Sequence, residues 1–155
     1  MFDKILVSRC FLGDIVRYNS QKLTLNHPLL QLWQIQNRIV SICPEVSGGL
    51  PVPREPAEQQ FENNKVITIT GVDVTSQFNA GAQQALALCH KHNIRFAVLK
   101  ESSPSCGSSL IYDGTFSNKK IAGQGVTSQL LTQAGISVFS ENNLTALEKL
   151  LDRAI

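Results

Sequence analysis

Residues 4–10 have the sequence Lys4-Ile5-Leu6-Val7-Ser8-Arg9-Cys10, and this stretch decides the fold that we expect. A short apolar run that polar residues follow at once is typical of a parallel strand buried on both faces. Two further runs have the same character, at residues 38–43 and 94–99. Because patterns typical of helices separate the three runs, the chain is predicted to contain repeated strand–helix–strand units.

The rest of the chain continues this alternation, so we expect an α/β fold with three layers: a mostly parallel, Rossmann-like sheet flanked by helices. Four prolines and two glycines in residues 44–56 exclude a regular helix or a central strand there. The other expected strands are a sheet-edge strand at 65–70, a short strand and turn at 110–116, and a strand at 136–139. The expected helices run from after Asn26 to Ile35, from Asp73 or Thr75 to His92, over 127–134 before Gly135, and over 144–151.

Composition indicates an ordinary globular protein. Of its 155 residues, 43% are hydrophobic and 17% are charged, which excludes wholesale disorder. A net charge of +2 gives no strong signal for nucleic-acid binding, and no apolar segment is long enough to span a membrane. We therefore expect a single cytoplasmic domain over residues 1–155.

Three of the four cysteines follow predicted strands. Cys10 and Cys43 end their runs, and Cys106 lies in a polar loop after the third run. In an open α/β sheet, ligands bind beyond the carboxyl ends of the strands, so these thiols are predicted to meet at one edge of the sheet. The fourth cysteine, Cys89, lies within a predicted helix, where a thiol acts as a small apolar core residue.

The cysteine spacing favours a metal centre. The chain has no CxxC motif, which argues against a thioredoxin-type dithiol, a zinc ribbon or a bacterial ferredoxin. Three thiolates suit either a catalytic zinc that also holds a water, or a cubane iron–sulfur cluster with one iron left open. Spacing does not choose between these metals. Glu45 stands two residues after Cys43, within reach of either centre as a general acid or base.

Several motifs together resemble a known family. They are Ser8-Arg9-Cys10-Phe11-Leu12-Gly13, the proline-rich stretch 43–58, Gly71-Val72-Asp73-Val74-Thr75, Ser103-Pro104-Ser105-Cys106-Gly107 and Gly123-Gln124-Gly125-Val126-Thr127. In these segments the chain is similar to the thiouracil desulfurases, a family first catalogued as a domain of unknown function. The resemblance spans nearly the whole chain, and it implies a 4Fe-4S cluster bound by Cys10, Cys43 and Cys106, with the fourth iron open.

The resemblance also implies catalytic residues. The family's glutamate falls on Glu45 and its serine on Ser103, with Ser105 in the same motif. We expect the open iron to bind the sulfur of a thiolated pyrimidine, either 4-thiouracil or its nucleoside or nucleotide, while Glu45 activates water. The products are uracil and sulfide, without net redox chemistry.

The remaining site residues and the competing functions are also predictions. We expect the substrate to be bound by Arg9, Arg17, Arg54 and Ser105. Thiolated nucleotides of RNA are a further possible substrate. Two other functions stay open: a metal-binding or cluster-binding sensor or RNA-associated module without catalysis, and a thiol-based sulfur carrier that works without metal.

Overall fold

The computed structural model describes residues 2–21 and 24–153, and its centre is a four-stranded parallel sheet. The strands lie in the order β2 (Ile39–Ile42), β1 (Ile5–Ser8), β5 (Phe96–Val98) and β8 (Ser137–Phe139). Every neighbouring pair is parallel, which confirms the predicted α/β class. The three strands that precede the predicted cysteine ligands are therefore adjacent in the sheet.

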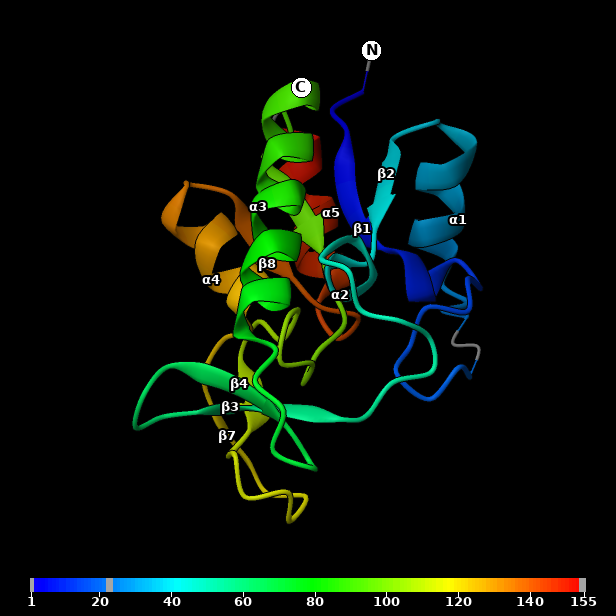
Figure 1. Cartoon of the computed structure of the whole chain (residues 1–155). Coiled ribbons are helices and arrows are strands. Elements are labelled where there is room, and N and C mark those ends of the chain that lie inside the picture. The colour runs from blue at the N-terminus through cyan, green and yellow to red at the C-terminus, as the bar shows by residue number, and fades with distance from the viewer. Residues whose placement is uncertain (1, 22–23, 154–155) are drawn as a thin grey trace.

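Helices cover both faces of this sheet and complete the three predicted layers (Figure 1). Side chains alternate along β1, so Ile5 and Val7 join one core and Leu6 joins the other. The first core includes residues of α1 (Pro28–Ile35) and α5 (Leu144–Arg153), and the second includes residues of α3 (Thr75–His92) and α4 (Val126–Gln133). Among the described helices, none is long and apolar enough to cross a membrane.

The boundaries of the helices follow local chemistry. Helix α1 is capped by His27 rather than Asn26, because the His27 side chain accepts a hydrogen bond from the Leu29 backbone N–H, and Pro28 occupies the first helical position. Helix α3 ends at Asn93, whose φ of 54° is left-handed. After α4, Gly135 has a φ of 89°, as expected for the glycine that terminates this helix.

The strand predicted at 65–70 does not join the main sheet. Instead, β4 (Lys65–Thr68) pairs antiparallel with β3 (Ala57–Gln60) in a separate hairpin. Polar and apolar residues alternate in this strand because one of its faces contributes to a separate small core, in which Val66 packs with Val74 and Phe78. A second hairpin pairs β6 (Leu110–Tyr112) with β7 (Lys120–Ala122). Both hairpins lie beyond the carboxyl edge of the main sheet (Figure 1).

The proline-rich segment contains one helical turn, although its prolines exclude a longer regular helix. Helix α2 (Pro44–Ser47) begins directly at Pro44, a position where the missing N–H of proline costs no hydrogen bond. Helix α2 packs against α3 through two glycines: a Cβ atom on Gly48 would collide with the Gln77 carbonyl, and one on Gly81 with the Pro44 carbonyl. The turn after β2 is thus held tightly against the core.

Candidate active site

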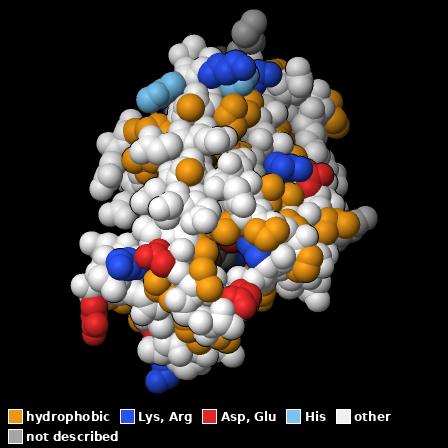
Figure 2. Space-filling view, in the orientation of Figure 1, with side chains coloured by type: hydrophobic (Ala, Val, Ile, Leu, Met, Phe, Trp, Pro, Cys, Tyr) orange, Lys and Arg blue, Asp and Glu red, His pale blue; other side chains and the backbone are white. Residues whose placement is uncertain are grey.

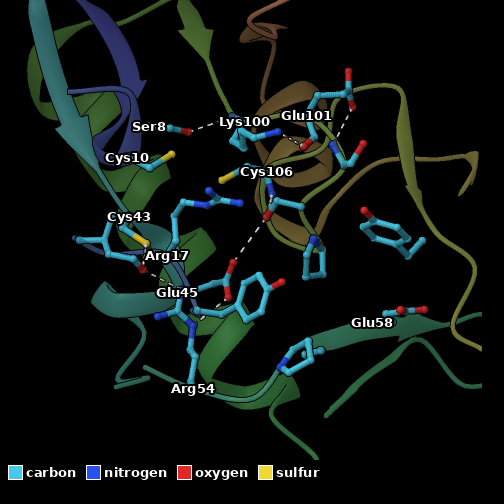
Figure 3. Close-up of a pocket in the computed structure, with 18 of the residues that line it drawn as sticks. Ser8, Cys10, Arg17, Cys43, Glu45, Arg54, Glu58, Lys100, Glu101 and Cys106 are labelled. Atoms are coloured by element: carbon cyan, nitrogen blue, oxygen red, sulfur yellow. Dashed lines mark hydrogen bonds and ion pairs between the residues drawn. The ribbon is translucent and has the colours of Figure 1, made fainter. Parts of the chain in front are cut away.

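A pocket of about 380 Å³ lies where the carboxyl edge of the sheet faces the two hairpins. Cys10, Cys43 and Cys106 all line it. Figure 3 shows their sulfur atoms turned toward the same space, with Arg17 and Glu45 beside it. The structure thus brings together the three thiols that are far apart in sequence, at the sheet edge where they were predicted to meet.

Each thiol is placed by a different local structure. Cys10 lies in the 3-10 turn η1 (Arg9–Phe11), which continues directly from β1, and Cys43 caps α2 directly after β2. Cys106 lies eight residues beyond β5, so its loop needs further support. The first turn of α4 provides it, because the Ser128 hydroxyl donates to the Cys106 carbonyl at 2.7 Å and the Gly125 N–H donates to the Gly107 carbonyl at 2.8 Å.

Burial keeps these thiols neutral in the absence of a ligand. Burial and, to a smaller extent, the neighbouring Cys43 raise the pKa of Cys10 to about 11, against the charges of Lys100 and Arg17. The pKa values of Cys43 and Cys106 are also raised, chiefly by burial. Cys106 is affected by both Cys43 and Cys10, which agrees with a common pocket.

Cys89 lies apart from this group. It is buried in α3 among the residues between the sheet and α3–α4, and it does not line the pocket. Burial alone raises its pKa to about 11. This is the core position that its helical sequence context predicted.

Glu45 enters the pocket from α2 and is held on both carboxylate oxygens (Figure 3). Its Oε1 accepts from Arg54 Nε at 3.1 Å, and its Oε2 accepts from the Ser103 hydroxyl at 3.4 Å. The glutamate therefore bridges the Cys43 side of the pocket to the loop that carries Cys106. Its side chain is only 16% exposed, so few water molecules compete for the carboxylate.

The two candidate serines have different positions. Ser103 lines the pocket, and its oxygen accepts from the backbone N–H groups of Ser105 and Cys106, each at 3.1 Å. Ser105 is fully buried, with its hydroxyl 2.8 Å from that of Thr127, and it is not among the pocket residues. The structure therefore does not bring Ser105 to where a substrate would lie, because α4 occupies its hydroxyl.

The three candidate arginines all line the pocket but differ in their partners. Arg9 pairs with Asp14 at 3.1 Å near the surface. Arg17 is close enough to lower the pKa of Cys10, and its guanidinium forms no hydrogen bond or ion pair with the described residues. Arg54 donates through all three of its side-chain nitrogen atoms to protein acceptors.

Glu101, which was not among the predicted site residues, follows β5 and lines the pocket. Its Oε1 accepts from four backbone N–H groups and its Oε2 from two hydroxyls, all of them from Ser102, Ser108, Ser109 and Leu110. Burial favours the neutral carboxyl, but these hydrogen bonds prevail and lower the pKa of Glu101 to about 2. In the sequence, the only indication of this role was that Glu101 directly precedes a serine-rich loop.

The outer wall of the pocket was not predicted either. It is formed on the β6–β7 hairpin by Tyr112, Phe116, Asn118 and Lys120. Buried Glu58 of β3 holds this loop, because its Oε1 accepts from the Gly114 and Phe116 backbone N–H groups. No local pattern predicts such a contact across more than fifty residues. In Figure 2, hydrophobic side chains surround a hollow in the lower half of the molecule, with a basic side chain visible inside it.

Comparisons with known proteins agree with this geometry. A protein of Bacillus subtilis (strain 168), YbbK, described as uncharacterized, is 45% identical over 148 residues, which cover 90% of this chain and 97% of that protein. A solved structure described as the 4Fe-4S-dependent thiouracil desulfidase TudS is 49% identical and superposes with a TM-score of 0.94 over 97% of this chain and 98% of that one. Residues 5–143 match the family described as 2-thiouracil desulfurase. This chain therefore belongs to the 2-thiouracil desulfurase family.

Proposed function

We propose that this protein hydrolyses the carbon–sulfur bond of a thiolated pyrimidine, without net redox chemistry, at a 4Fe-4S cluster held by Cys10, Cys43 and Cys106. The observation that carries the proposal is the convergence of these three thiols and Glu45 in one pocket. The preferred substrate is 4-thiouracil, as the free base or within its nucleoside or nucleotide. The name of the similar solved structure supports both the cluster and this substrate class.

The donor set suits a cluster better than a single ion. Among residues 2–21 and 24–153, no group of three or more His, Cys, Asp or Glu side chains could hold one metal ion. The three thiols nevertheless line one pocket. In a cubane each thiolate bonds to a different iron, so its ligands surround a wider space than the ligands of zinc do. Binding of the cluster would release protons, because the thiols are neutral without it.

When bound, the cluster supplies a Lewis-acidic iron that polarises the carbon–sulfur bond. The chain supplies the proton transfers. Glu45 accepts a proton from water as the oxygen attacks the thiocarbonyl carbon, and it returns a proton to the departing sulfur. The balance is one water consumed, with one carbonyl and one hydrogen sulfide formed. The Ser103 hydroxyl, 3.4 Å from Glu45 Oε2, holds the carboxylate toward the reacting carbon.

The two walls of the pocket suit the two sides of such a substrate. The sheet edge presents the thiols and Glu45, where the thiocarbonyl would lie. The hairpin wall presents the rings of Tyr112 and Phe116 for the flat face of a pyrimidine. Arg17 and Lys120 add positive charge for polar groups of the substrate.

The raised pKa values of the cysteines do not single out one thiol as the nucleophile of a sulfur carrier. A carrier needs a thiolate that attacks sulfur, and a nucleophilic cysteine normally has a lowered pKa. All four cysteines here have raised pKa values. A sensor without catalytic activity would bind the same cluster but release no sulfide.

Anaerobic reconstitution with iron and sulfide, followed by assay of sulfide release, tests the proposal. We expect release of sulfide and uracil in equal amounts from 4-thiouracil, its nucleoside or its nucleotide. Protein without iron should release none. A fully loaded protein that releases no sulfide from any thiolated pyrimidine would leave the sensor function as the better explanation.

A further inference from the structure

Arg54 lies beneath Glu45 at the end of the proline-rich loop, and its side chain is only 7% exposed. A long cationic side chain is rarely buried unless its charge is paired and its N–H groups are bonded. Arg54 meets both conditions. Its Nε lies 3.1 Å from Glu45 Oε1, in an ion pair whose members are both largely sheltered from water.

The other nitrogen atoms of Arg54 bind the backbone of two separate segments. Nη1 donates to the Pro51 carbonyl at 3.0 Å, within the loop that follows α2. Nη2 donates to the Val16 carbonyl at 2.9 Å, on the segment that follows Cys10, and this carbonyl also accepts from the Cys43 thiol at 3.8 Å. The Arg54 backbone N–H donates to the Tyr18 carbonyl at 2.7 Å, which joins the same two segments.

We propose that Arg54 is a positioning residue that fixes the direction of the Glu45 carboxylate, and not a ligand of the substrate. This inference rests on the catalytic role proposed for Glu45. The guanidinium holds Oε1 from one side, which leaves Oε2 directed at the Ser103 hydroxyl and the pocket. Ser103 is in turn held by the Cys106 backbone N–H, so the carboxylate is fixed between two cysteine-bearing segments.

The alternative role, direct binding of substrate, suits Arg17 better. Arg17 lines the same pocket, and its guanidinium has no hydrogen bond or ion pair to the described residues, whereas each side-chain nitrogen of Arg54 already has a protein acceptor. Turning Arg54 toward a substrate would leave Glu45 without its partner in a site of low solvent exposure, and breaking such a buried pair is costly.

Kinetics of Arg54→Gln in the reconstituted protein separate the two roles. We expect kcat to fall roughly ten- to hundred-fold, because a small misplacement of a reacting group has effects of this size, while KM stays within about three-fold. Arg54→Lys should recover part of kcat, since it keeps the charge but loses the planar fork. A rise in KM with kcat retained, in either variant, would overturn the proposal.

A matched control is Arg95→Gln, which removes the surface ion pair of Arg95 with Asp3. It should leave kcat and KM unchanged. In a Glu45→Gln background, Arg54→Gln should lower kcat no further, because both changes remove the same interaction. If the two losses multiply, Arg54 acts independently of Glu45 and the proposal is wrong.

A structural measurement tests the inference without turnover. In a crystal structure of the metal-free Arg54→Gln variant, or of Arg54→Lys if the first does not fold, we expect the Glu45 carboxylate to leave the Ser103 hydroxyl. An unmoved carboxylate in this variant would overturn the positioning role. If the loaded unmodified protein releases no sulfide, the proposed function fails, and this measurement still decides whether Arg54 orients Glu45.

Discussion

Glu101 shows how one residue can fix a whole loop. The loop that follows β5 contains backbone N–H groups that would be unpaired without an acceptor. The Glu101 carboxylate accepts hydrogen bonds from four of them. Its hydrogen bonds span residues 102–110, so Cys106 sits in the middle of a loop organised around one buried charge. The motif containing Cys106 was recognisable from the sequence. The role of Glu101 was not, because the sequence pattern does not indicate which carboxylate is buried.

Replacement of Glu101 by Gln is expected to reduce the free energy of unfolding at pH 7 by about 2–3 kcal/mol. The pKa of Glu101 is lowered from 4.5 to about 2 on folding, so its stabilisation is complete above pH 4.5 and is lost as the pH falls toward 2. The difference between the variant and the unmodified protein should therefore shrink over that range. Chemical denaturation at pH 7 and pH 3 measures it.

The exposed carboxylate of Glu62 provides the control, because Glu62→Gln removes a charge without buried hydrogen bonds. It should change stability by less than about 0.5 kcal/mol at either pH. A loss for Glu101→Gln that is equal at both values would show that the charge of Glu101 is not what stabilises the loop.

Glu45 is the residue on which the proposed chemistry depends. Glu45→Gln keeps the shape of the side chain but cannot accept a proton, so we expect kcat to fall about a hundred-fold or more, with iron content unchanged. Sulfide release and iron analysis on the same sample measure both. Turnover equal to that of the unmodified protein would remove Glu45 from its role.

Among the elements, the short helix α2 has the greatest influence on the site because it carries Glu45 and begins next to Cys43. It is pressed onto α3 by the two close approaches at Gly48 and Gly81. The sequence showed that residues 44–56 could not be a regular long element, but it did not reveal the single turn. That turn exists because Pro44 fits the first helical position and because two glycines far apart in sequence leave room for it.

Replacement of Gly81 by Ala should displace α2, because the new Cβ would collide with the Pro44 carbonyl. We expect a loss of about 1–3 kcal/mol in the free energy of unfolding and a lower iron content after reconstitution. Asn79→Ala, on the exposed side of the same helix, introduces the same residue without the collision and should change neither. Full stability and full loading of Gly81→Ala would contradict the close packing of α2.

The elements differ in how well the sequence predicts them, for a physical reason. The parallel strands β1 and β5 were recognisable because burial on both faces requires a continuous apolar run. Strand β2 lies at the edge of the sheet and is only partly buried, but its sequence is also mostly apolar. Strand β3 was not recognisable, because Ala57–Gln60 is largely polar. Its side chains are needed as hydrogen-bond partners: Glu58 binds the β6–β7 loop, and Gln59 donates to the Pro104 carbonyl at 2.9 Å. Such partners depend on the tertiary fold.

In the whole molecule, the site lies between a rigid α/β core and two hairpins. The core supplies the three thiols and Glu45, and the β6–β7 hairpin supplies the aromatic wall. The edge of the sheet at which the thiols meet could be predicted, because parallel strands place their carboxyl ends together. The position of the hairpins could not, since their contacts join β3 to residues more than fifty positions away.

Single replacement of the cysteines by Ala should divide them into two groups. Cys10→Ala, Cys43→Ala and Cys106→Ala each remove a proposed cluster ligand and should reduce iron content and the cluster absorbance after anaerobic reconstitution. Cys89→Ala removes only a buried apolar group and should retain both, with a stability loss of about 1 kcal/mol. Iron loss in Cys89→Ala, or full loading without Cys106, would contradict the proposed ligand set.

The central claim is that the pocket replaces the substrate's sulfur by an oxygen from water. The most direct measurement is mass spectrometry of the uracil formed when the reconstituted protein acts on 4-thiouracil, or on its nucleoside or nucleotide, in water labelled with heavy oxygen and without added oxidant or reductant. The account predicts one heavy oxygen in each uracil and one sulfide for each uracil formed. Uracil without the label, or a reaction that requires a reductant, would contradict it.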